Sequence, residues 1–168
     1  MISISRKTPR SLVAVATLSL ALLTPAAAPA APTVVNCSPT KMKIVASTLV
    51  SNSPASNSFS NIAETTVGFT QGGINASCVI VRFSAETFSI GAANNLRIRP
   101  FLDNTTTAFP PHVRYSGDDG TVSTVHSFEF VFPSVAPGNH AIRIQGMSSA
   151  GGGSSTLSNR TTVVQFAP

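Results

Sequence analysis

STVHSFEFVF, residues Ser123 to Phe132, is the stretch that decides the fold, because aromatic and polar side chains alternate along it. Successive side chains of an extended chain point to opposite faces, so Phe128, Phe130 and Phe132 share one face. An apolar face opposite a polar one is typical of a strand that lies between a core and solvent. The stretch therefore predicts a half-buried antiparallel β-strand.

The same pattern continues on both sides of this stretch. The turn Val135-Ala136-Pro137-Gly138-Asn139 leads into a second alternating segment, His140 to Gln145. Segment 85–93 is ambiguous between a short strand and a helical turn. Further strands are predicted over residues 42–50, 61–70, 77–84, 96–102, 113–116 and 161–166.

Seven or eight short strands with no convincing helix predict an all-β fold, a single antiparallel β-sandwich. Among sandwiches we expect a jelly roll, because eight strands that pair into two sheets suit a chain of this length. Pro100 lies inside the predicted strand 96–102, where it indicates a sheet edge or a bulge. The sequence shows no internal repeat, which disfavours a solenoid or a propeller.

The first thirty residues predict a cleavable signal peptide. Arg6, Lys7 and Arg10 form a basic region, residues 11–23 are apolar, and Ala28-Pro29-Ala30 offers a cleavage site. We therefore expect one domain over residues 31–168 that is secreted or periplasmic. No second apolar segment is long enough to cross a membrane, so no transmembrane segment is expected after cleavage.

Charge disfavours a nucleic-acid partner. The whole chain has a formal net charge of +5, but three of its eleven basic residues lie in the predicted signal peptide. Residues 31–168 then carry eight basic residues against six acidic ones, a net charge of +2. A nearly neutral domain with scattered charges does not have the basic surface that nucleic acid requires.

Cys37 and Cys78 are the two cysteines of the chain. In an oxidising compartment the simple interpretation is one disulfide between them. In the chain-entropy model, a disulfide that closes a loop of this size stabilises the folded protein by roughly 4 kcal/mol. Two cysteines this far apart, with no further ligands nearby, do not indicate a redox or metal site.

No residue pattern indicates an enzyme, a metal or another cofactor. The three histidines lack metal-ligand spacing, the acidic loop residues lack the calcium-loop pattern, and no nucleophile-elbow motif is present. The glutamates are too scattered to predict a glycosidase pair. The residues weighed here are His112, His126, His140, Asp103, Asp118, Asp119, Glu64, Glu86 and Glu129.

Two groups of residues are candidates for binding. Loops at the ends of a sandwich commonly carry function, which points to Asp103, Asn104, Asp118 and Asp119. Arginines would form a site for anionic ligands if their strands adjoin, although single solvent-facing arginines are the simpler interpretation. This second group contains Arg97, Arg99, Arg143 and Arg160.

Aromatic composition argues against one common kind of sugar site. The chain has ten Phe, one Tyr and no Trp. Exposed Trp and Tyr rings usually supply the platforms on which sugars stack, whereas Phe is more often buried. A site built from Asn, Asp and backbone groups stays open.

Residues 135–164, VAPGNHAIRIQGMSSAGGGSSTLSNRTTVV, resemble a pattern found in bacterial secreted or fibre-associated β-sandwich proteins. The resemblance implies a fold and a structural or binding role, and it transfers no active-site residue. The spacing of Cys37 and Cys78 is also similar to that of chaperone–usher pilins, but the ending Gln165-Phe166-Ala167-Pro168 and the short segment 31–36 depart from them.

The sequence thus predicts a non-enzymatic binding or structural protein, with an extracellular ligand or self-assembly as its partner. A fimbrial or fibre subunit is the first alternative. A hydrolase that uses loop-borne His and Asp residues is the second.

Overall fold

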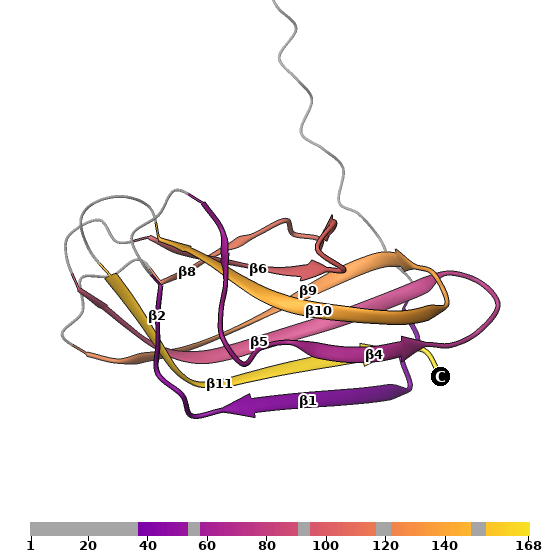
Figure 1. Cartoon of the computed structure of the whole chain (residues 1–168), viewed down its shortest axis with the longest axis horizontal. Coiled ribbons are helices and arrows are strands. Elements are labelled where there is room, and N and C mark those ends of the chain that lie inside the picture. Colours follow the sequence, from indigo (N-terminus) through magenta and orange to yellow (C-terminus); the bar gives the residue numbers. More distant parts are fainter. Residues whose placement is uncertain (1–36, 54–57, 91–94, 117–121, 149–153) are drawn as a thin grey trace, which may run out of the picture. The chain divides into compact units, whose positions relative to one another are not determined.

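Two antiparallel β-sheets packed face to face make up the protein, seen in a computed structural model (Figure 1). The structure describes residues 37–53, 58–90, 95–116, 122–148 and 154–168. Within these ranges every regular element is a strand, as the sequence predicts. None of these ranges contains a helix long and apolar enough to cross a membrane.

Each sheet is defined by the order of its strands. Sheet 1 has the order β1 (Lys41–Ser47), β11 (Ser154–Phe166), β5 (Ser77–Ile90) and β9 (Thr124–Val135), with β2 (Ser51–Ser53) also paired to β11. In sheet 2, β10 (Gly138–Ser148) pairs with β6 (Leu96–Leu102) on one side and with β3 (Ser60–Asn61) and β4 (Val67–Gln71) on the other; β6 also pairs with β7 (Thr106–Thr107) and β8 (Val113–Ser116).

The eight longest strands pair in a nested order, in which the first pairs with the last, the second with the second-last, and so on. Strand β1 pairs with β11, β4 with β10, β5 with β9 and β6 with β8, all antiparallel. The first two and the last two of these eight strands thus enclose the middle four. Two sheets of four long strands in this nested order form a jelly roll, which confirms the predicted fold.

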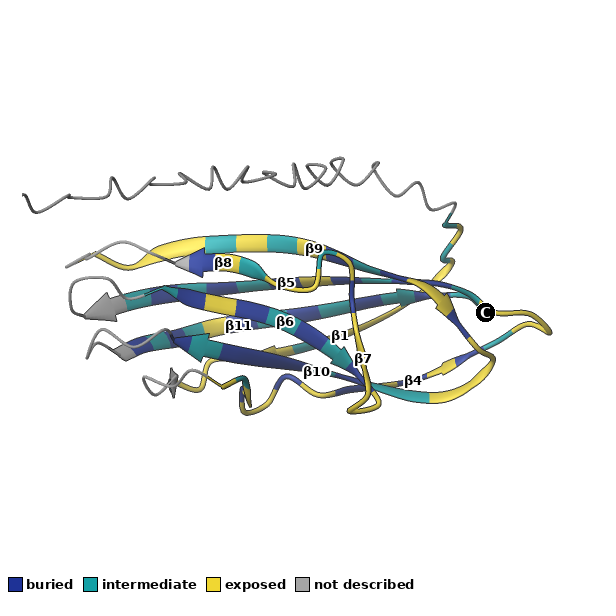
Figure 2. Ribbon diagram, turned by 90° about the horizontal axis from the view of Figure 1, so that it is seen from above, coloured by how far each residue is buried: buried dark blue, intermediate teal, exposed yellow. Residues whose placement is uncertain are grey.

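The core lies between the inner faces of the two sheets. Figure 2 shows buried and more exposed residues alternating along β6. In β9, Phe130 and Phe132 are buried and Phe128 is half-buried, so the alternation that opened the sequence analysis is confirmed. Ile98, Ile142 and other apolar residues of sheet 2 supply the opposing layer.

The predicted disulfide is present. Cys37 and Cys78 are bonded, with their Cα atoms 5.5 Å apart. Cys37 precedes the edge strand β1, whereas Cys78 is buried in the interior strand β5. The bond therefore anchors the chain before β1 to the middle of sheet 1.

Segment 61–70 is not one strand, and that prediction is wrong. It is divided between β3 and β4, because the chain turns between them. Glu64 has a left-handed backbone with φ 53°, and the Thr65 hydroxyl donates to the carbonyl oxygen of Ile62 at 2.8 Å. Hydrogen bonds of a Thr side chain to nearby backbone groups compete with strand pairing.

The ambiguous segment 85–93 is strand as far as Ile90, and residues 91–94 lie outside the described ranges. The extension of β5 is paired on both sides, by β9 and by the first half of β11. Strand β11 accordingly begins at Ser154 rather than at the predicted residue 161. These pairings join distant segments, which a local pattern does not report.

Pro100 lies at a local sheet edge, as predicted. On one side of β6, β8 pairs no further than Ile98 and β7 begins its pairing at Phe101. The residue without an N–H group therefore lies where β6 has no neighbouring strand on that side.

Candidate functional site: an arginine-rich sheet face

Four arginines lie on the outer face of sheet 2. Arg97 and Arg99 alternate along β6 with the buried residues Leu96 and Ile98, so both arginines point outward. Arg114 precedes the buried Tyr115 on β8, and Arg143 lies between buried isoleucines on β10. The residues Arg97, Arg99, Arg114 and Arg143 are called the arginine face below.

Strand register brings these arginines together. Arg97 lies directly opposite Arg114, and Arg143 lies opposite Phe101, which is two residues beyond Arg99 on β6. Residues two apart on a strand are separated by about 6.8 Å, so the face presents positive charge along roughly 13 Å of β6. Like charges directly opposite each other destabilise a sheet.

Arg99 is held in place by hydrogen bonds and by aromatic rings. Its Nε donates to Oε1 of Gln145 at 2.8 Å, and Nε2 of Gln145 donates to Oδ1 of Asn61 at 2.9 Å. Its guanidinium carbon lies 4.1 Å from the centre of the Phe59 ring and 4.8 Å from that of Phe101. Burial among these groups lowers the pKa of Arg99 from its ordinary value. The guanidinium is therefore already ordered before any ligand binds.

The face continues into the loop after β6, where two of the predicted binding residues lie. Asn104 accepts a hydrogen bond from Nη1 of Arg143 at 3.0 Å. Asp103 and Asn104 both have left-handed backbones, with φ of 49° and 60°, a conformation that these two residue types tolerate best. The loop thus orients Arg143 on the arginine face.

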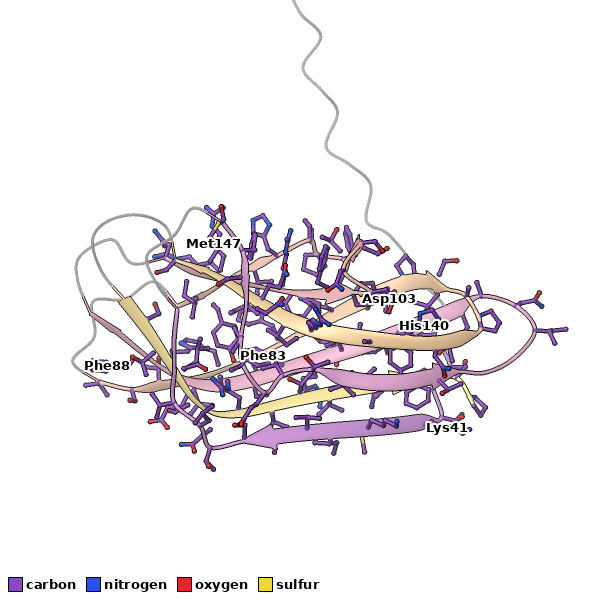
Figure 3. The ribbon with its side chains drawn as sticks, in the orientation of Figure 1. Lys41, Phe83, Phe88, Asp103, His140 and Met147 are labelled. Atoms are coloured by element: carbon purple, nitrogen blue, oxygen red, sulfur yellow. A yellow bond between two sulfur atoms is a disulfide. The ribbon has the colours of Figure 1, made fainter. Side chains whose placement is uncertain are left out.

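Asp103 is engaged with β10 instead of being free for a ligand. Its Oδ1 accepts from the backbone amide of Ala141 at 2.8 Å, and its Oδ2 lies 2.7 Å from Nδ1 of His140 (Figure 3). The other ring nitrogen of His140 lies 2.8 Å from the carbonyl oxygen of Ala136. Both partners of the ring are acceptors, so the arrangement suits the doubly protonated imidazolium.

The pKa values of the pair move apart. Burial opposes ionisation of His140, but its hydrogen bonds to Asp103 and Ala136 and the charge of Asp103 outweigh burial and raise the pKa of His140. For Asp103, burial is likewise outweighed, by the hydrogen bonds from His140 and Ala141 and by the charge of His140, so the pKa of Asp103 is lowered. The charged pair is favoured in the folded protein.

Stability should therefore depend on pH through this pair. The contribution of His140 to the free energy of unfolding is complete below the ordinary His pKa of 6.5, and it is lost as pH rises through the raised pKa. The contribution of Asp103 is complete above the ordinary Asp pKa of 3.8, and it is lost as pH falls through the lowered pKa. We expect the melting temperature to fall as pH rises from 6.5 through the raised pKa of His140, and His140→Gln to remove that part of the fall. Thermal unfolding followed by circular dichroism checks this, with His112→Gln as the control; an equal pH dependence in His140→Gln would contradict it.

The described carboxylates lie away from the arginine face or are neutralised. On sheet 1, Oε2 of Glu129 lies 2.8 Å from Nη2 of Arg82, and Glu86 accepts from Nδ2 of Asn159 at 2.7 Å. Glu64 accepts a hydrogen bond from the Ser47 hydroxyl. Only Asp103, among described acidic residues, borders the arginine face, and it is paired with His140. Among the described residues, the outer face of sheet 2 therefore carries more basic than acidic side chains.

The other predicted site residues that the structure describes do not gather into one site. Asp118 and Asp119 lie outside the described residues. The His112 ring lies 6.0 Å from that of Phe59 at the border of the arginine face, and His126 lies against Tyr115. No three His, Cys, Asp or Glu side chains of the described ranges come together as metal ligands do.

Sequence reasoning placed Arg160 with the arginines of sheet 2 and missed Arg114. Arg160 instead belongs to β11 of sheet 1, where it is buried toward the interior. Arg114 was missed because the pairing of β8 with β6 is not visible in the sequence, although the alternation of Val113-Arg114-Tyr115 already puts Arg114 on a polar face.

No protein-family model matches the sequence, and no curated protein matches it. Among solved structures, it is similar to the infectious bursal disease virus VP2 subviral particle (12% identity, 76% of this chain, 32% of that chain, TM-score 0.53) and to the Gt strain of the same virus (14%, 85%, 36%, TM-score 0.52). The C-terminal CBM6 of LamC from Zobellia galactanivorans is more distant (10%, 73%, 98%, TM-score 0.37). The chain spans about a third of the viral chains, and the likeness to them concerns the fold alone.

Proposed function

We propose that this protein is an exported, non-enzymatic binding domain whose arginine face holds an acidic polysaccharide. The observation that carries the proposal is the set of four arginines on one sheet face, with no described carboxylate among them except the neutralised Asp103. Guanidinium groups bind carboxylate and sulfate groups through paired hydrogen bonds. The Cys37–Cys78 bond supports an oxidising compartment outside the cytosol.

The form of the face favours a polysaccharide over nucleic acid. Single-stranded nucleic acid is usually held on open aromatic rings that stack with bases. Here the rings of Phe59 and Phe101 are in contact with the Arg99 guanidinium, so they serve to order that charge. Gln145 and Asn61 lie beside it as polar neighbours suited to sugar hydroxyl groups.

A binding role also agrees with the state of His140. Both of its ring nitrogens are engaged by acceptors, so neither is available to take a proton from a substrate. The hydrolase alternative would require His112, Asp118 and a Ser hydroxyl within hydrogen-bond reach of one another, and Asp118 lies outside the described ranges.

Titration with polysaccharides tests the proposal. We expect alginate, which carries carboxylates, or dextran sulfate to bind in isothermal titration calorimetry, neutral dextran not to bind, and affinity to fall with added salt. The double variant R97Q/R114Q should weaken binding roughly tenfold or more, because it removes two charge-assisted contacts.

The control is R82Q, which removes one positive charge from the outer face of sheet 1, where Arg82 pairs with Glu129. Its affinity should be that of the unmodified protein. An equal loss in R82Q, or tighter binding to single-stranded DNA than to either acidic polysaccharide, would refute the proposal.

A fibre subunit is the second candidate, favoured by the edge strand β1. Its outward side chains include Met42 and Ile44, which are 56% and 55% exposed. However, Lys43 points toward the other sheet, because its Nζ donates to the carbonyl oxygen of Gly68 on β4. Inward-pointing charges are a common protection of sheet edges against pairing, which ranks this candidate second. Polymers in light scattering would reverse that ranking.

A further inference from the structure

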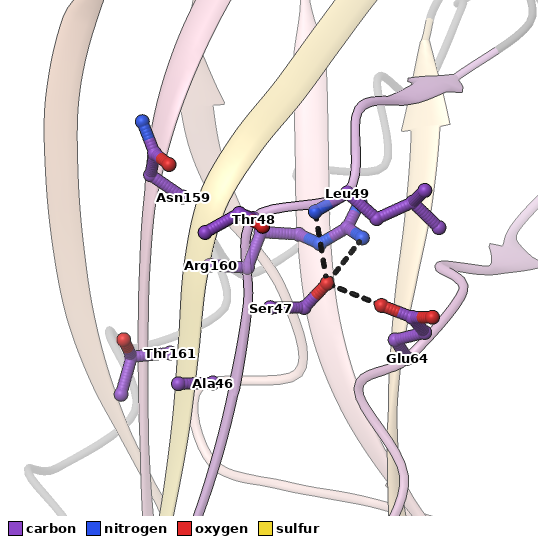
Figure 4. A pocket seen from close by; sticks show the side chains of 8 residues that line it. All are labelled: Ala46, Ser47, Thr48, Leu49, Glu64, Asn159, Arg160 and Thr161. Carbon is purple, nitrogen blue, oxygen red and sulfur yellow. Dashed lines mark hydrogen bonds between the residues drawn. The ribbon is translucent and has the colours of Figure 1, made fainter.

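A pocket of about 660 Å³ lies beside the edge strand β1, away from the arginine face (Figure 4). Ser47 and Leu49 line it at the end of β1, Glu64 lines it from the turn between β3 and β4, and Asn159 and Arg160 line it from β11. Pockets that bind small molecules commonly have volumes of about 300–1,000 Å³.

A bulge in β11 directs Arg160 toward the interior. The register between β11 and β5 shifts between Ser158 and Thr161, and Asn159 has a left-handed backbone with φ 47°. Before the shift Leu157 is buried, and after it the buried positions are Arg160 and Thr162, so the bulge changes which alternate residues face inward. Left-handed residues other than glycine, and bulges, concentrate at functional sites.

The Arg160 guanidinium is buried, and among the described residues it has no direct ion-pair partner. The residue is 1% exposed, and its Nε has no hydrogen-bond partner among the described residues. To other described residues, its Nη1 and Nη2 make long contacts of 3.5 Å, to the carbonyl oxygen of Leu157 and to the hydroxyl of Ser47. Within the described ranges no carboxylate forms an ion pair with it. Burial lowers the pKa of Arg160, and the charge of Glu64 only partly opposes this effect. A buried cation that lacks a direct ion pair gains from an added anion.

A negative group lies on the other side of Ser47. Oε2 of Glu64 accepts a hydrogen bond from the same Ser47 hydroxyl that Arg160 approaches (Figure 4). Glu64 is exposed and has φ 53°, a second left-handed residue in this pocket. The pocket therefore presents a cation and an anion on either side of one hydroxyl group.

We propose that this pocket binds a small zwitterion of the α-amino-acid class. Its carboxylate pairs with the Arg160 guanidinium, its ammonium group pairs with Glu64, and an apolar side chain contacts Leu49. Glu64 repels a dianion such as sulfate, but it attracts a ligand whose ammonium group lies next to its carboxylate. Leu49 is 48% exposed, so an apolar group of a ligand can reach its side chain.

Three related ligands separate the two ionic contacts. The probes are L-leucine, 4-methylpentanoate, which lacks the ammonium group, and 3-methylbutylamine, which lacks the carboxylate. In isothermal titration calorimetry we expect leucine to bind and each analogue to bind at least about tenfold more weakly, because each loses one charge-assisted contact. Equal affinity for leucine and 4-methylpentanoate, or no leucine binding, would overturn the proposal.

Variants then assign each contact. Glu64→Gln should weaken leucine to the level of 4-methylpentanoate and leave 4-methylpentanoate itself no weaker, whereas Glu129→Gln, a matched change on the outer face of sheet 1, should change neither. Arg160→Gln should abolish leucine binding, with its fold checked by circular dichroism. If that variant does not fold, the Glu64→Gln comparison still decides: an unchanged affinity for leucine would refute the site. These variants leave the arginine face intact, so this test and that of the polysaccharide fail independently.

Discussion

Phe83→Ala is expected to lower the free energy of unfolding by about 3–5 kcal/mol, the usual range for removing a fully buried Phe. Phe83 has no exposed surface and lies on the inner face of β5, which pairs with a strand on each side (Figure 3). Its ring centre is 5.4 Å from that of Tyr115, which belongs to the opposite sheet. The substitution leaves a cavity between the two sheets that rigid strands on both sides cannot fill.

Phe88→Ala is the matched control, because the same ring is removed from the same strand. Phe88 is half-buried, and its position on β5 puts it on the opposite face from Phe83. Urea denaturation of both variants gives the comparison, and we expect a clearly smaller loss for Phe88→Ala. Equal losses would show that the inner face of β5 is not the centre of the core.

Loss of the disulfide is expected to cost roughly 4 kcal/mol in the chain-entropy model. Cys37 and Cys78 are 41 residues apart in sequence, so the bond restricts a long loop in the unfolded chain. In the folded protein it holds the segment before β1, which pairs with β11 alone in sheet 1. The double variant C37A/C78A should therefore melt well below the oxidised protein.

Reduction provides the control for this second prediction. A phosphine reductant should lower the melting temperature of the unmodified protein and leave that of C37A/C78A unchanged. Protection of the β1 amides against hydrogen exchange should fall more than that of β5, since β5 keeps both of its neighbours. A melting temperature unaffected by reduction would contradict the stabilising role of the bond.

The two stability variants also bear on the proposed sites. The arginine face depends on β6 and β10, whose inner residues Ile98 and Ile142 are fully buried in the shared core. The zwitterion pocket depends on the end of β1 and on the bulge in β11. Reduction of the disulfide should therefore disturb the pocket beside β1 before it disturbs the arginine face.

The sequence by itself determined the strands that have one apolar face. Alternation in 123–132 and 140–145 is a local property of the extended chain, so it survives in β9 and β10 whatever their neighbours are. The turn between these strands followed from Pro137 and Gly138, because their backbone preferences are also local. The disulfide followed from there being two cysteines and from the expected compartment.

Only the tertiary structure decided which strands are neighbours, and both proposed sites depend on that. Alternation shows that Arg97 points outward, but its position opposite Arg114 results from the pairing of β6 with β8. The inward direction of Arg160 results from a bulge against β5, whose pairing residues lie more than 70 positions earlier in the chain. Pairing between distant strands is set by the combined burial of both sheets, which no single segment of the sequence encodes.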